Sequence, residues 1–368
     1  MSEDISPLAP RQERAWLDHL ELLANLPYPA AALIPTVLAT LRRGFDADIG
    51  SFGWVAGPHL EPVAFWSERL TEPVFRWFNA HLDEVFAEFP LRQQLESDGA
   101  VVRQIQSMPG YEDHWHHRQL LEPLGVRWAM AVPVFDRQGA CDGFLYLFRR
   151  AAAGPYTDGD QARLRRARER LRGLGAAVDS TLPPCPLRPA RVATLQFDAT
   201  GRLLARGQGA IELLYLCHDS RMGILDWAAP DQSALPAQAR AMVGALLADT
   251  TSPAVVQCDE NRAAGCFRFR AERLHALDGG PCQIAVTISH WEPIDLTVAR
   301  ALLDWPLSPQ EKRLIVLSTR RPDQRQLAEA LGITVATLKS YINRLHARLA
   351  IPSRQALIDR LLAESVAA

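Results

Sequence analysis

Several features are scarce or absent in this sequence. Six cysteines occur among 368 residues, and no two of them form a C-x-x-C pair. We therefore expect reduced thiols and neither a disulfide framework nor a zinc knuckle. No apolar stretch approaches the roughly 18 to 20 residues that cross a bilayer, and the start, MSEDISPLAPRQERAW, lacks the basic and apolar regions of a signal peptide. We expect a soluble, cytoplasmic protein with no membrane partner.

Catalytic signatures are also missing. The sequence has no GxSxG elbow, no GxxxxGK[ST] phosphate loop, no HExxH and no kinase motif set. These absences disfavour an enzyme, and we expect no cofactor. No receiver-like α/β unit with clustered aspartates precedes the C-terminal helices, so a phosphorelay response regulator is also disfavoured.

Charge is unevenly distributed along the chain. Residues 305–368 hold ten Lys and Arg against five Asp and Glu, whereas residues 1–304 hold 30 against 37. A basic C-terminal segment after an acidic body favours a polyanionic partner for that segment. Chance clustering in a short segment is the alternative.

The order of helical and strand-like segments predicts a multidomain α+β protein. The expected parts are an N-terminal helix (1–29), a first α/β domain (30–178), a Pro-rich linker (179–189), a second domain (190–295) and an all-α domain (304–368). Elements expected in the first half are helices at 12–25, 30–43 and 74–82, and strands at 49–55, 60–66, 127–135 and 143–149.

Residues 156–178 read as one long helix with a short heptad seam. The seam consists of Leu164, Ala167, Leu171, Leu174 and Val178. Such a seam fits a dimer-forming helix, or a helix packed on its own domain. After the linker, residues 191–214 are expected to form a strand, a turn, a second strand and a helix, and further strands are expected at 265–277 and 283–293.

The C-terminal segment predicts four short helices. Ser308 and Glu311 form a capping box, Asp323 caps the second helix, and Thr334 caps the third. Gly332 occupies the tight turn between the second and third helices, where a positive φ is easiest for glycine. This is the pattern of a helix-turn-helix, whose second element enters the DNA major groove.

The third helix has two unlike sides. Its apolar stripe is Leu338, Ile342, Leu345 and Leu349, and its far side carries Ala336, Ser340, Asn343, Arg344 and Ala347. Small residues allow a close approach to a groove wall, Asn343 suits a base edge, and Arg344 suits a guanine edge or a phosphate. The candidate DNA-contacting residues are Arg325, Gln326, Thr334, Thr337, Lys339, Ser340, Tyr341, Asn343 and Arg344.

Residues 307–354 resemble the DNA-binding domain of LuxR-type (GerE-type) bacterial transcription regulators. The matching residues are Leu307, Ser308, Glu311, Ala328, Leu331, Ile333, Thr334, Thr337, Lys339, Leu349, Ile351 and Arg354, and the departures are Gln310, Leu338, Tyr341 and Arg348. The resemblance implies that Lys339, Ser340 and Asn343 contact bases and that the last helix, 353–363, dimerises. A homodimer on double-stranded DNA is expected.

The remaining parts are similar to sensory domains. Residues 30–178 look like a GAF domain, and the segments around 193–214 and 267–293 are similar to the first and last parts of a PAS domain. Six of the nine tryptophans lie in the first 130 residues. The candidate residues for a small-molecule pocket are Trp54, Phe65, Trp66, Trp77, Trp115 and Trp128. Ordinary core packing is the alternative.

Two further sites are conceivable. His114, His116 and His117, with Asp113, suggest a metal site, although no Cys/His set at a supporting spacing follows. Exposed or ligand-capping histidines are one alternative, and a haem ligand is another. Cys258 and Cys266 flank an expected turn and suggest a redox pair, against the alternative of inert buried thiols.

The sequence thus predicts a bacterial DNA-binding transcription regulator that responds to a signal through its first two domains. Two other function classes stay open. One is a ligand-processing or signalling enzyme with an accessory helical tail, and the other is an interaction module that does not bind DNA.

Overall fold

The structure is a computed structural model of the whole chain. It describes residues 9–57, 60–67, 77, 80–81, 84, 103–104, 110, 113, 115, 117–136, 138–174, 185–207, 209–218, 235–248, 255–275, 277, 280–320 and 323–367. Among these residues, no helix is long and apolar enough to span a membrane. The fold is a mixed α+β arrangement with two antiparallel sheets, each of five strands.

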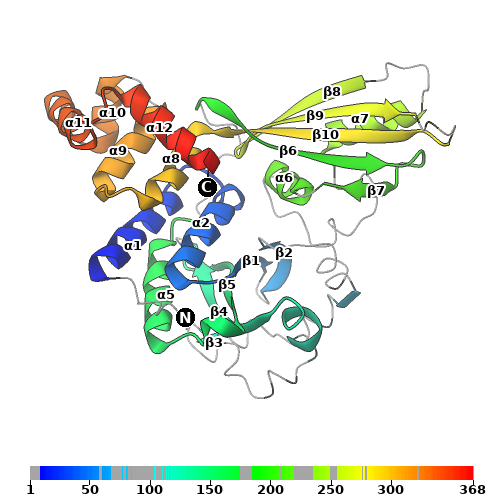
Figure 1. Cartoon of the computed structure of the whole chain (residues 1–368), viewed down its shortest axis with the longest axis horizontal. Coiled ribbons are helices and arrows are strands. Elements are labelled where there is room, and N and C mark those ends of the chain that lie inside the picture. The colour runs from blue at the N-terminus through cyan, green and yellow to red at the C-terminus, as the bar shows by residue number, and fades with distance from the viewer. Residues whose placement is uncertain are drawn as a thin grey trace.

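The first sheet has the strand order β2-β1-β5-β4-β3. Its strands are β1 (Ile49–Ala56), β2 (Glu61–Ser67), β3 (Arg103–Gln104), β4 (Val126–Phe135) and β5 (Cys141–Arg150). Helices α1 (Pro10–Ala24), α2 (Ala30–Phe45) and α5 (Asp158–Arg170) lie together beside it (Figure 1). We call this sheet and these helices the front unit. Its two N-terminal helices and four longer strands match the predicted ranges to within two residues, whereas most of the helix expected at 74–82 falls outside the described residues.

Helix α2 is the central helix of the front unit. Its sequence, AAALIPTVLATLRRGF, is apolar on nearly every side, and eleven of its sixteen residues are buried. Such a helix needs neighbours all round. A Cβ on Gly44 would lie 2.4 Å from the Trp16 ring of α1, so the ring packs on α2 at a position where a side chain would clash with it.

The burial of helix α5 favours packing on its own domain over the dimer-forming interpretation of its seam. Leu164, Ala167, Leu171 and Leu174 are all at most 1% exposed within the single chain. The helix ends at Arg170, and the chain then turns against α1, where a Cβ on Gly173 would lie 2.8 Å from the Ala24 carbonyl oxygen. Val178 lies outside the described residues. The apolar stripe is therefore covered by the protein's own front unit, and it is not free to pair with a second copy.

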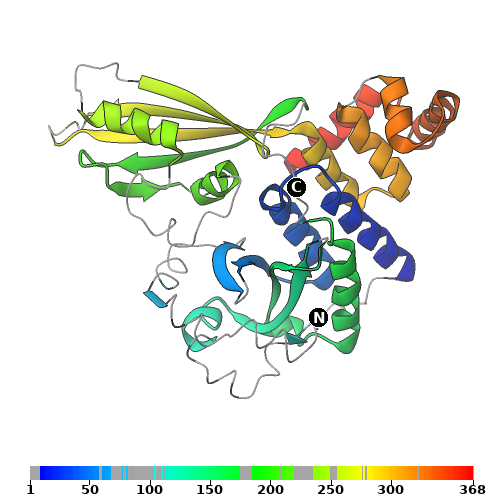
Figure 2. The same cartoon turned by 180° about the vertical axis from the view of Figure 1, so that it is seen from behind.

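The second sheet has the order β7-β6-β10-β9-β8. Its strands are β6 (Leu187–Phe197), β7 (Leu203–Arg206), β8 (Val255–Arg262), β9 (Gly265–Leu274) and β10 (Gln283–Pro293). Helices α6 (Ala210–Cys217) and α7 (Ala237–Ala248) cover one face (Figure 2). Strand β6 begins inside the range assigned to the linker, and β8 was given no range from the sequence, although the turn expected between Cys258 and Cys266 lies at its end. Its sequence, VVQCDENR, belongs to a polar edge strand, which lacks the apolar alternation of a covered strand.

The register of the second sheet excludes the expected redox pair. Cys258 of β8 is opposite Phe269, and Cys266 of β9 is opposite Asn261. Phe269 is fully buried on the helix-covered face, so Cys258 shares that face. Successive residues of a strand alternate between faces, so Cys266 lies on the other face, three positions further along. Both cysteines are free thiols.

Four helices form the C-terminal part, as the sequence predicts. They are α9 (Pro309–Arg320), α10 (Gln324–Leu331), α11 (Val335–Leu349) and α12 (Arg354–Ala367), and we call them the tail. Helix α8 (Ile294–Ala301) and a short 3-10 turn (Leu302–Asp304) join β10 to the tail. The tail packs on the rest of the protein through α9, which lies against α8 and α1, and through α12, which lies against α8.

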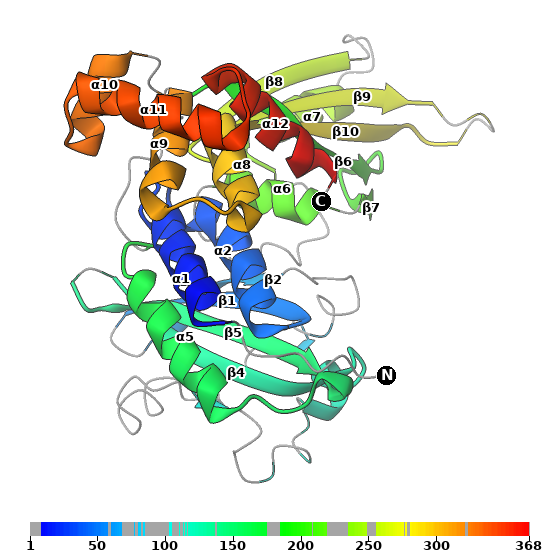
Figure 3. The ribbon, with the colours of Figure 1, turned by 60° about the vertical axis from the view of Figure 1, so that its left-hand side comes forward.

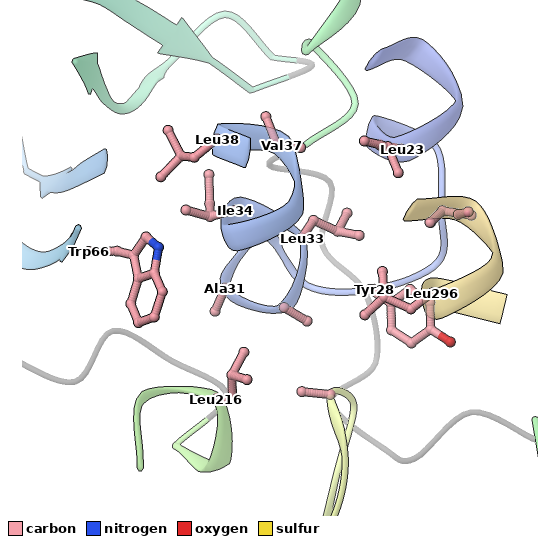
Figure 4. Close-up of a cluster of buried hydrophobic side chains, with 14 of the residues drawn as sticks. Leu23, Tyr28, Ala31, Leu33, Ile34, Val37, Leu38, Trp66, Leu216 and Leu296 are labelled. Carbon is pink, nitrogen blue, oxygen red and sulfur yellow. The ribbon is translucent and has the colours of Figure 1, made fainter. Parts of the chain in front are cut away.

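One hydrophobic core runs through all three parts. Figure 4 shows its centre, where Leu216 of α6 and Leu296 of α8 approach α2 from two sides. Trp66 of β2 lies beside Ile34 and Leu38 of α2 in the same view. Apolar side chains from both sheets and from α8 share this core. The front unit, the second sheet and the tail are therefore packed against one another and are not separate domains joined only by linkers.

Candidate nucleic-acid interface

The N-terminus of α9 is held by the predicted capping box. The Glu311 carboxylate accepts hydrogen bonds from the Ser308 backbone N–H at 2.7 Å and from the Ser308 hydroxyl at 2.8 Å. The Glu311 N–H donates back to the Ser308 Oγ at 3.3 Å. This reciprocal pair satisfies backbone donors that the first turn of a helix leaves free. Burial acts to raise the pKa of Glu311, but the hydrogen bonds from Ser308 and the pairing with Arg348 together outweigh it, so the pKa is lowered from its ordinary value.

Helices α10 and α11 are joined by a tight turn at Gly332, which has φ of 65°. The Gly332 N–H donates to the Glu329 carbonyl, and the Ile333 N–H donates to the Ala328 carbonyl, both at 3.0 Å. Ala328 is 2% exposed, so its small side chain lies where the helices meet. Asp323 accepts from the Arg325 N–H at 2.9 Å, and Thr334 accepts from the Thr337 N–H at 3.1 Å. Both predicted caps are therefore formed.

The two sides of α11 differ in the predicted way. Leu338 and Leu345 are buried, and Ile342 and Leu349 are partly buried against the same core. Exposed residues on α11 are Ala336, Thr337, Lys339, Ser340, Asn343, Arg344, Ala347 and Arg348. No Asp or Glu occurs anywhere in α11. The exposed side of this helix therefore presents small, amide, hydroxyl and cationic groups without a carboxylate to oppose an anion.

The flanking candidates sit on neighbouring elements. Arg325 and Gln326 are exposed in the first turn of α10, at the opposite end of that helix from the Gly332 turn. Thr334 is exposed but its hydroxyl lies 2.8 Å from that of Thr337, so the two form a local pair. Tyr341 is only half-exposed, and its hydroxyl lies 3.5 Å from the Ser308 Oγ.

Two arginines on α11 are held by contacts that sequence reasoning did not find. The Arg348 guanidinium lies 2.8 Å from Glu311, which ties the end of α11 to the start of α9. The Arg344 guanidinium lies over the Tyr341 ring, 5.7 Å from its centroid. On α9, exposed Arg313 donates to the Ala330 carbonyl at 3.4 Å. The pairing of Arg348 with Glu311 joins residues 37 positions apart, and helical periodicity carries no signal for such a contact.

The interface lies at an outer end of the molecule. Figures 1 and 3 show α10 and α11 on the far side of the tail from both sheets, whereas α9, α12 and α8 lie between them and the front unit. The exposed side of α11 is therefore open to a large partner without movement of the described parts.

The tryptophans of the front unit fall into two groups. Trp54 and Trp66 are each 2% exposed, and both pack against Tyr215 of α6, with ring centroids 5.6 Å and 4.6 Å away. This placement favours the core-packing alternative for these two residues. Their role is to join the first sheet to α6, which belongs to the second sheet's layer of helices.

A second aromatic group includes Trp77, which packs against a smaller cluster of buried residues that is separate from the main core. Trp77 contacts Trp115 at 5.3 Å between ring centroids and His81 at 4.9 Å, and its indole N–H donates to Gln119 at 3.1 Å. Phe65 is half-buried, and Trp128 has the Arg127 guanidinium 5.5 Å from its ring centroid. The structure thus brings together Trp77 and Trp115 of the six candidate pocket residues, and separately Trp54 and Trp66.

The histidine cluster gives no metal site in the described part of the chain. His114 and His116 lie outside the described residues, and Asp113 forms an ion pair with Arg118. His117 is 8% exposed in the short helix His117–Leu121. No group of three or more His, Cys, Asp or Glu side chains suited to a metal ion occurs among the residues that the structure places.

Comparisons with known proteins do not identify a family. No protein-family model and no curated protein matches the chain. The sensor region of a sensor histidine kinase is 15% identical over 50% of this chain and 68% of that chain, with a TM-score of 0.19. The E.coli DhaR(N)-DhaL complex is 14% identical over 44% and 54%, with a TM-score of 0.16. An uncharacterized protein from Mycobacterium tuberculosis is 14% identical over 66% and 63%, with a TM-score of 0.18. Likenesses at these scores carry no functional argument.

Proposed function

We propose that this protein is a DNA-binding transcription regulator whose tail reads operator DNA through α11. The observation that carries the proposal is the exposed side of α11, which has small and hydrogen-bonding residues, three cations and no carboxylate, at an open end of the molecule. An ordinary solvated helix side would carry long residues of both charges. The composition found here suits a helix that enters a major groove, because amide, hydroxyl and cationic groups can contact base edges and phosphates.

Each candidate residue has a distinct part in this proposal. Asn343 and Ser340 read base edges, since an exposed amide can pair with the N6 and N7 atoms of adenine. Lys339 and Arg344 supply positive charge on the same side, and Arg325 and Gln326 contact phosphates from the start of α10. Thr334 and Thr337 lie at the N-terminus of α11, where helix N–H groups favour an anion. The resemblance of residues 307–354 to LuxR-type regulators supports these assignments.

The other parts of the chain act as sensory and coupling domains in this proposal. Their similarity to GAF and PAS domains supports a role in signal detection. The group of Trp77, Trp115 and His81 is the place we propose for a small organic ligand. Homodimerisation is part of the proposal, but the buried residues of α5 no longer serve it, so the exposed side of α12 is the proposed contact. No catalytic step is assigned.

The test is selection of DNA by the full-length protein. The protein is incubated with a random pool of duplexes, and bound duplexes are amplified, sequenced and measured at several salt concentrations. Lys339→Gln removes a cation from the proposed interface, and Arg165→Gln removes another exposed cation, from α5, as the matched control. We expect Lys339→Gln to reduce the slope of log affinity against log salt by about one, and Arg165→Gln to leave this slope unchanged. Failure of the wild-type protein to enrich any duplex would refute the proposal, as would equal effects of the two variants.

A further inference from the structure

A buried carboxylate connects the front unit to the tail. Asp295 lies at the start of α8 and is 0% exposed. The Tyr28 hydroxyl donates to its Oδ1, and the Arg320 Nε donates to its Oδ2. Tyr28 precedes α2 in the front unit, and Arg320 is the last residue of α9 in the tail. We call these three residues the Asp295 cluster. Figure 4 shows Tyr28 beside Leu296, the residue that follows Asp295 in α8.

The three members of the cluster support one another. The Arg320 guanidinium lies over the Tyr28 ring, 4.9 Å from its centroid. Burial, and then the charge of Asp295, raise the pKa of Tyr28 well above its ordinary value, so the hydroxyl stays protonated and donates. The Cys185 thiol, just before β6, adds a fourth contact by donating to Asp295 Oδ1 at 3.5 Å. Segments from the front unit, the second sheet and the tail therefore meet at one carboxylate.

The Asp295 cluster is not the arrangement expected if stability were its only role. Arg320 Nη2 is buried and has no hydrogen-bond partner among the residues that the structure describes. Removing charges from water is costly, and well-packed apolar residues often stabilise a buried joint better than an ion pair does. A buried pair does, however, hold its partners in a single geometry, because directional bonds are lost when the segments slide.

A second polar contact lies along the same joint. Arg300 of α8 donates to the Thr36 hydroxyl of α2 at 3.3 Å and pairs with Glu292 of β10 at 3.0 Å. Glu292 also accepts from the Thr297 hydroxyl at 2.6 Å. Helix α8 is thus fixed by directional bonds to the front unit on one side and to the second sheet on the other. Arg320 extends this fixation to the tail.

We propose that the Asp295 cluster regulates DNA binding by fixing the orientation of the tail on the front unit. The inference rests on the proposed function for its DNA readout. The cluster does not act by covering the interface, because the candidate residues Lys339, Ser340 and Asn343 of α11 are already exposed. It acts on orientation. In a dimer, the two copies of α11 must reach half-sites about one helical turn apart, so the angle between tail and front unit determines whether both fit.

The test compares two conservative variants of the full-length protein. Tyr28→Phe removes the hydroxyl that donates to Asp295 and keeps the ring beneath Arg320. Tyr156→Phe is the matched control, because Tyr156 is also buried, lies in the front unit and has the Arg149 guanidinium 4.0 Å from its ring centroid. Arg320→Lys is a second variant, which keeps the positive charge and removes the Nε–H bond. It serves if Tyr28→Phe fails to fold.

Hydrogen exchange measures the joint without DNA. We expect Tyr28→Phe to accelerate exchange of the backbone amides in α8 and in the last turn of α9 about tenfold, since the lost bond has a charged acceptor. Tyr156→Phe should leave these amides unchanged. Unchanged exchange in both Tyr28→Phe and Arg320→Lys would overturn the inference, because the cluster would not be holding the tail.

DNA binding then measures regulation. The probes are a duplex that the wild-type protein selects from a random pool and the same duplex with one half-site scrambled. We expect Tyr28→Phe to change affinity for the full site at least about threefold and affinity for the single half-site less than about twofold. Faster exchange with both affinities unchanged would overturn the regulatory role and leave an anchoring role only. If wild-type protein selects no duplex, the proposed function fails before any variant is compared, and the regulatory inference fails with it.

Discussion

His19 makes the contact between the front unit and the tail sensitive to acid. The residue lies on the buried side of α1, which packs against α9, and it is 1% exposed. Neither ring nitrogen has a hydrogen-bond partner in the part of the chain that the structure describes. Burial, and then the charge of Lys312 on α9, lower the pKa of His19 to about 3. The imidazole is therefore neutral in the folded protein at every pH near neutrality.

The sign of the pH effect follows from proton binding. In the unfolded chain the same histidine has a pKa near 6.5. Between pH 6.5 and 3 the unfolded state binds the proton and the folded state does not, so stability falls as pH falls through this window. One pH unit below 6.5, the loss from His19 is about 1.4 kcal/mol. His290, whose pKa is lowered to about 4, first of all by burial, contributes a similar loss in the second sheet.

The variant His19→Leu isolates the first of these contributions. Because the ring nitrogens of His19 make no hydrogen bond in the described structure, leucine removes buried polar atoms without breaking one. At about pH 7.5 we expect the free energy of unfolding of this variant to equal or exceed that of the wild type. On going to about pH 5.5 the variant should lose roughly half as much of this free energy as the wild type, because the contribution of His290 remains. The measurement is urea unfolding followed by tryptophan fluorescence at both pH values. If wild type and His19→Leu lose equal stability on acidification, the described placement of His19 is wrong.

Two further predictions concern the front unit and the tail. Leu171→Asp should destabilise the front unit by about 3 kcal/mol or more, because it places a charge in a fully buried position. The milder variant Leu171→Ala should have the same particle mass as the wild-type protein in light scattering. A change in that mass would show that the apolar stripe of α5 contacts a second subunit. Glu311→Ala should lower the stability of the tail by about 1 to 2 kcal/mol, because it removes the capping box and the partner of Arg348. Calorimetry checks this, and an unchanged melting temperature would contradict it.

The tail was predictable because its signals are local. A capping box, a helix-ending glycine and a 3.6-residue stripe each involve residues a few positions apart, so Ser308, Gly332 and Leu338 carry their structural meaning in the sequence itself. The exposed composition of α11 was predictable for the same reason. The first sheet followed from its runs of apolar strand residues.

What the sequence did not reveal depends on distant contacts. Tyr28 and Asp295 are 267 positions apart, and no periodicity links them. The tryptophans of the front unit suggest a pocket or a core equally well until Tyr215 is seen to pack on Trp54 and Trp66. The apolar stripe of α5 fits a second subunit or the protein's own α1, because burial has the same pattern in both cases.

The most direct test of the central claim is a salt titration of DNA binding by Asn343→Ala and Arg325→Ala. Asn343 is exposed and lies off the buried stripe of α11, and Arg325 is exposed in the first turn of α10. Neither change should therefore unfold the tail. Asn343→Ala should cost about 1 to 3 kcal/mol on the selected duplex and much less on random DNA. Arg325→Ala should weaken both duplexes alike and reduce the salt slope by about one. Equal weakening of both duplexes by Asn343→Ala would show that Asn343 does not read bases. Unchanged binding in both variants would contradict the assignment of this surface to DNA.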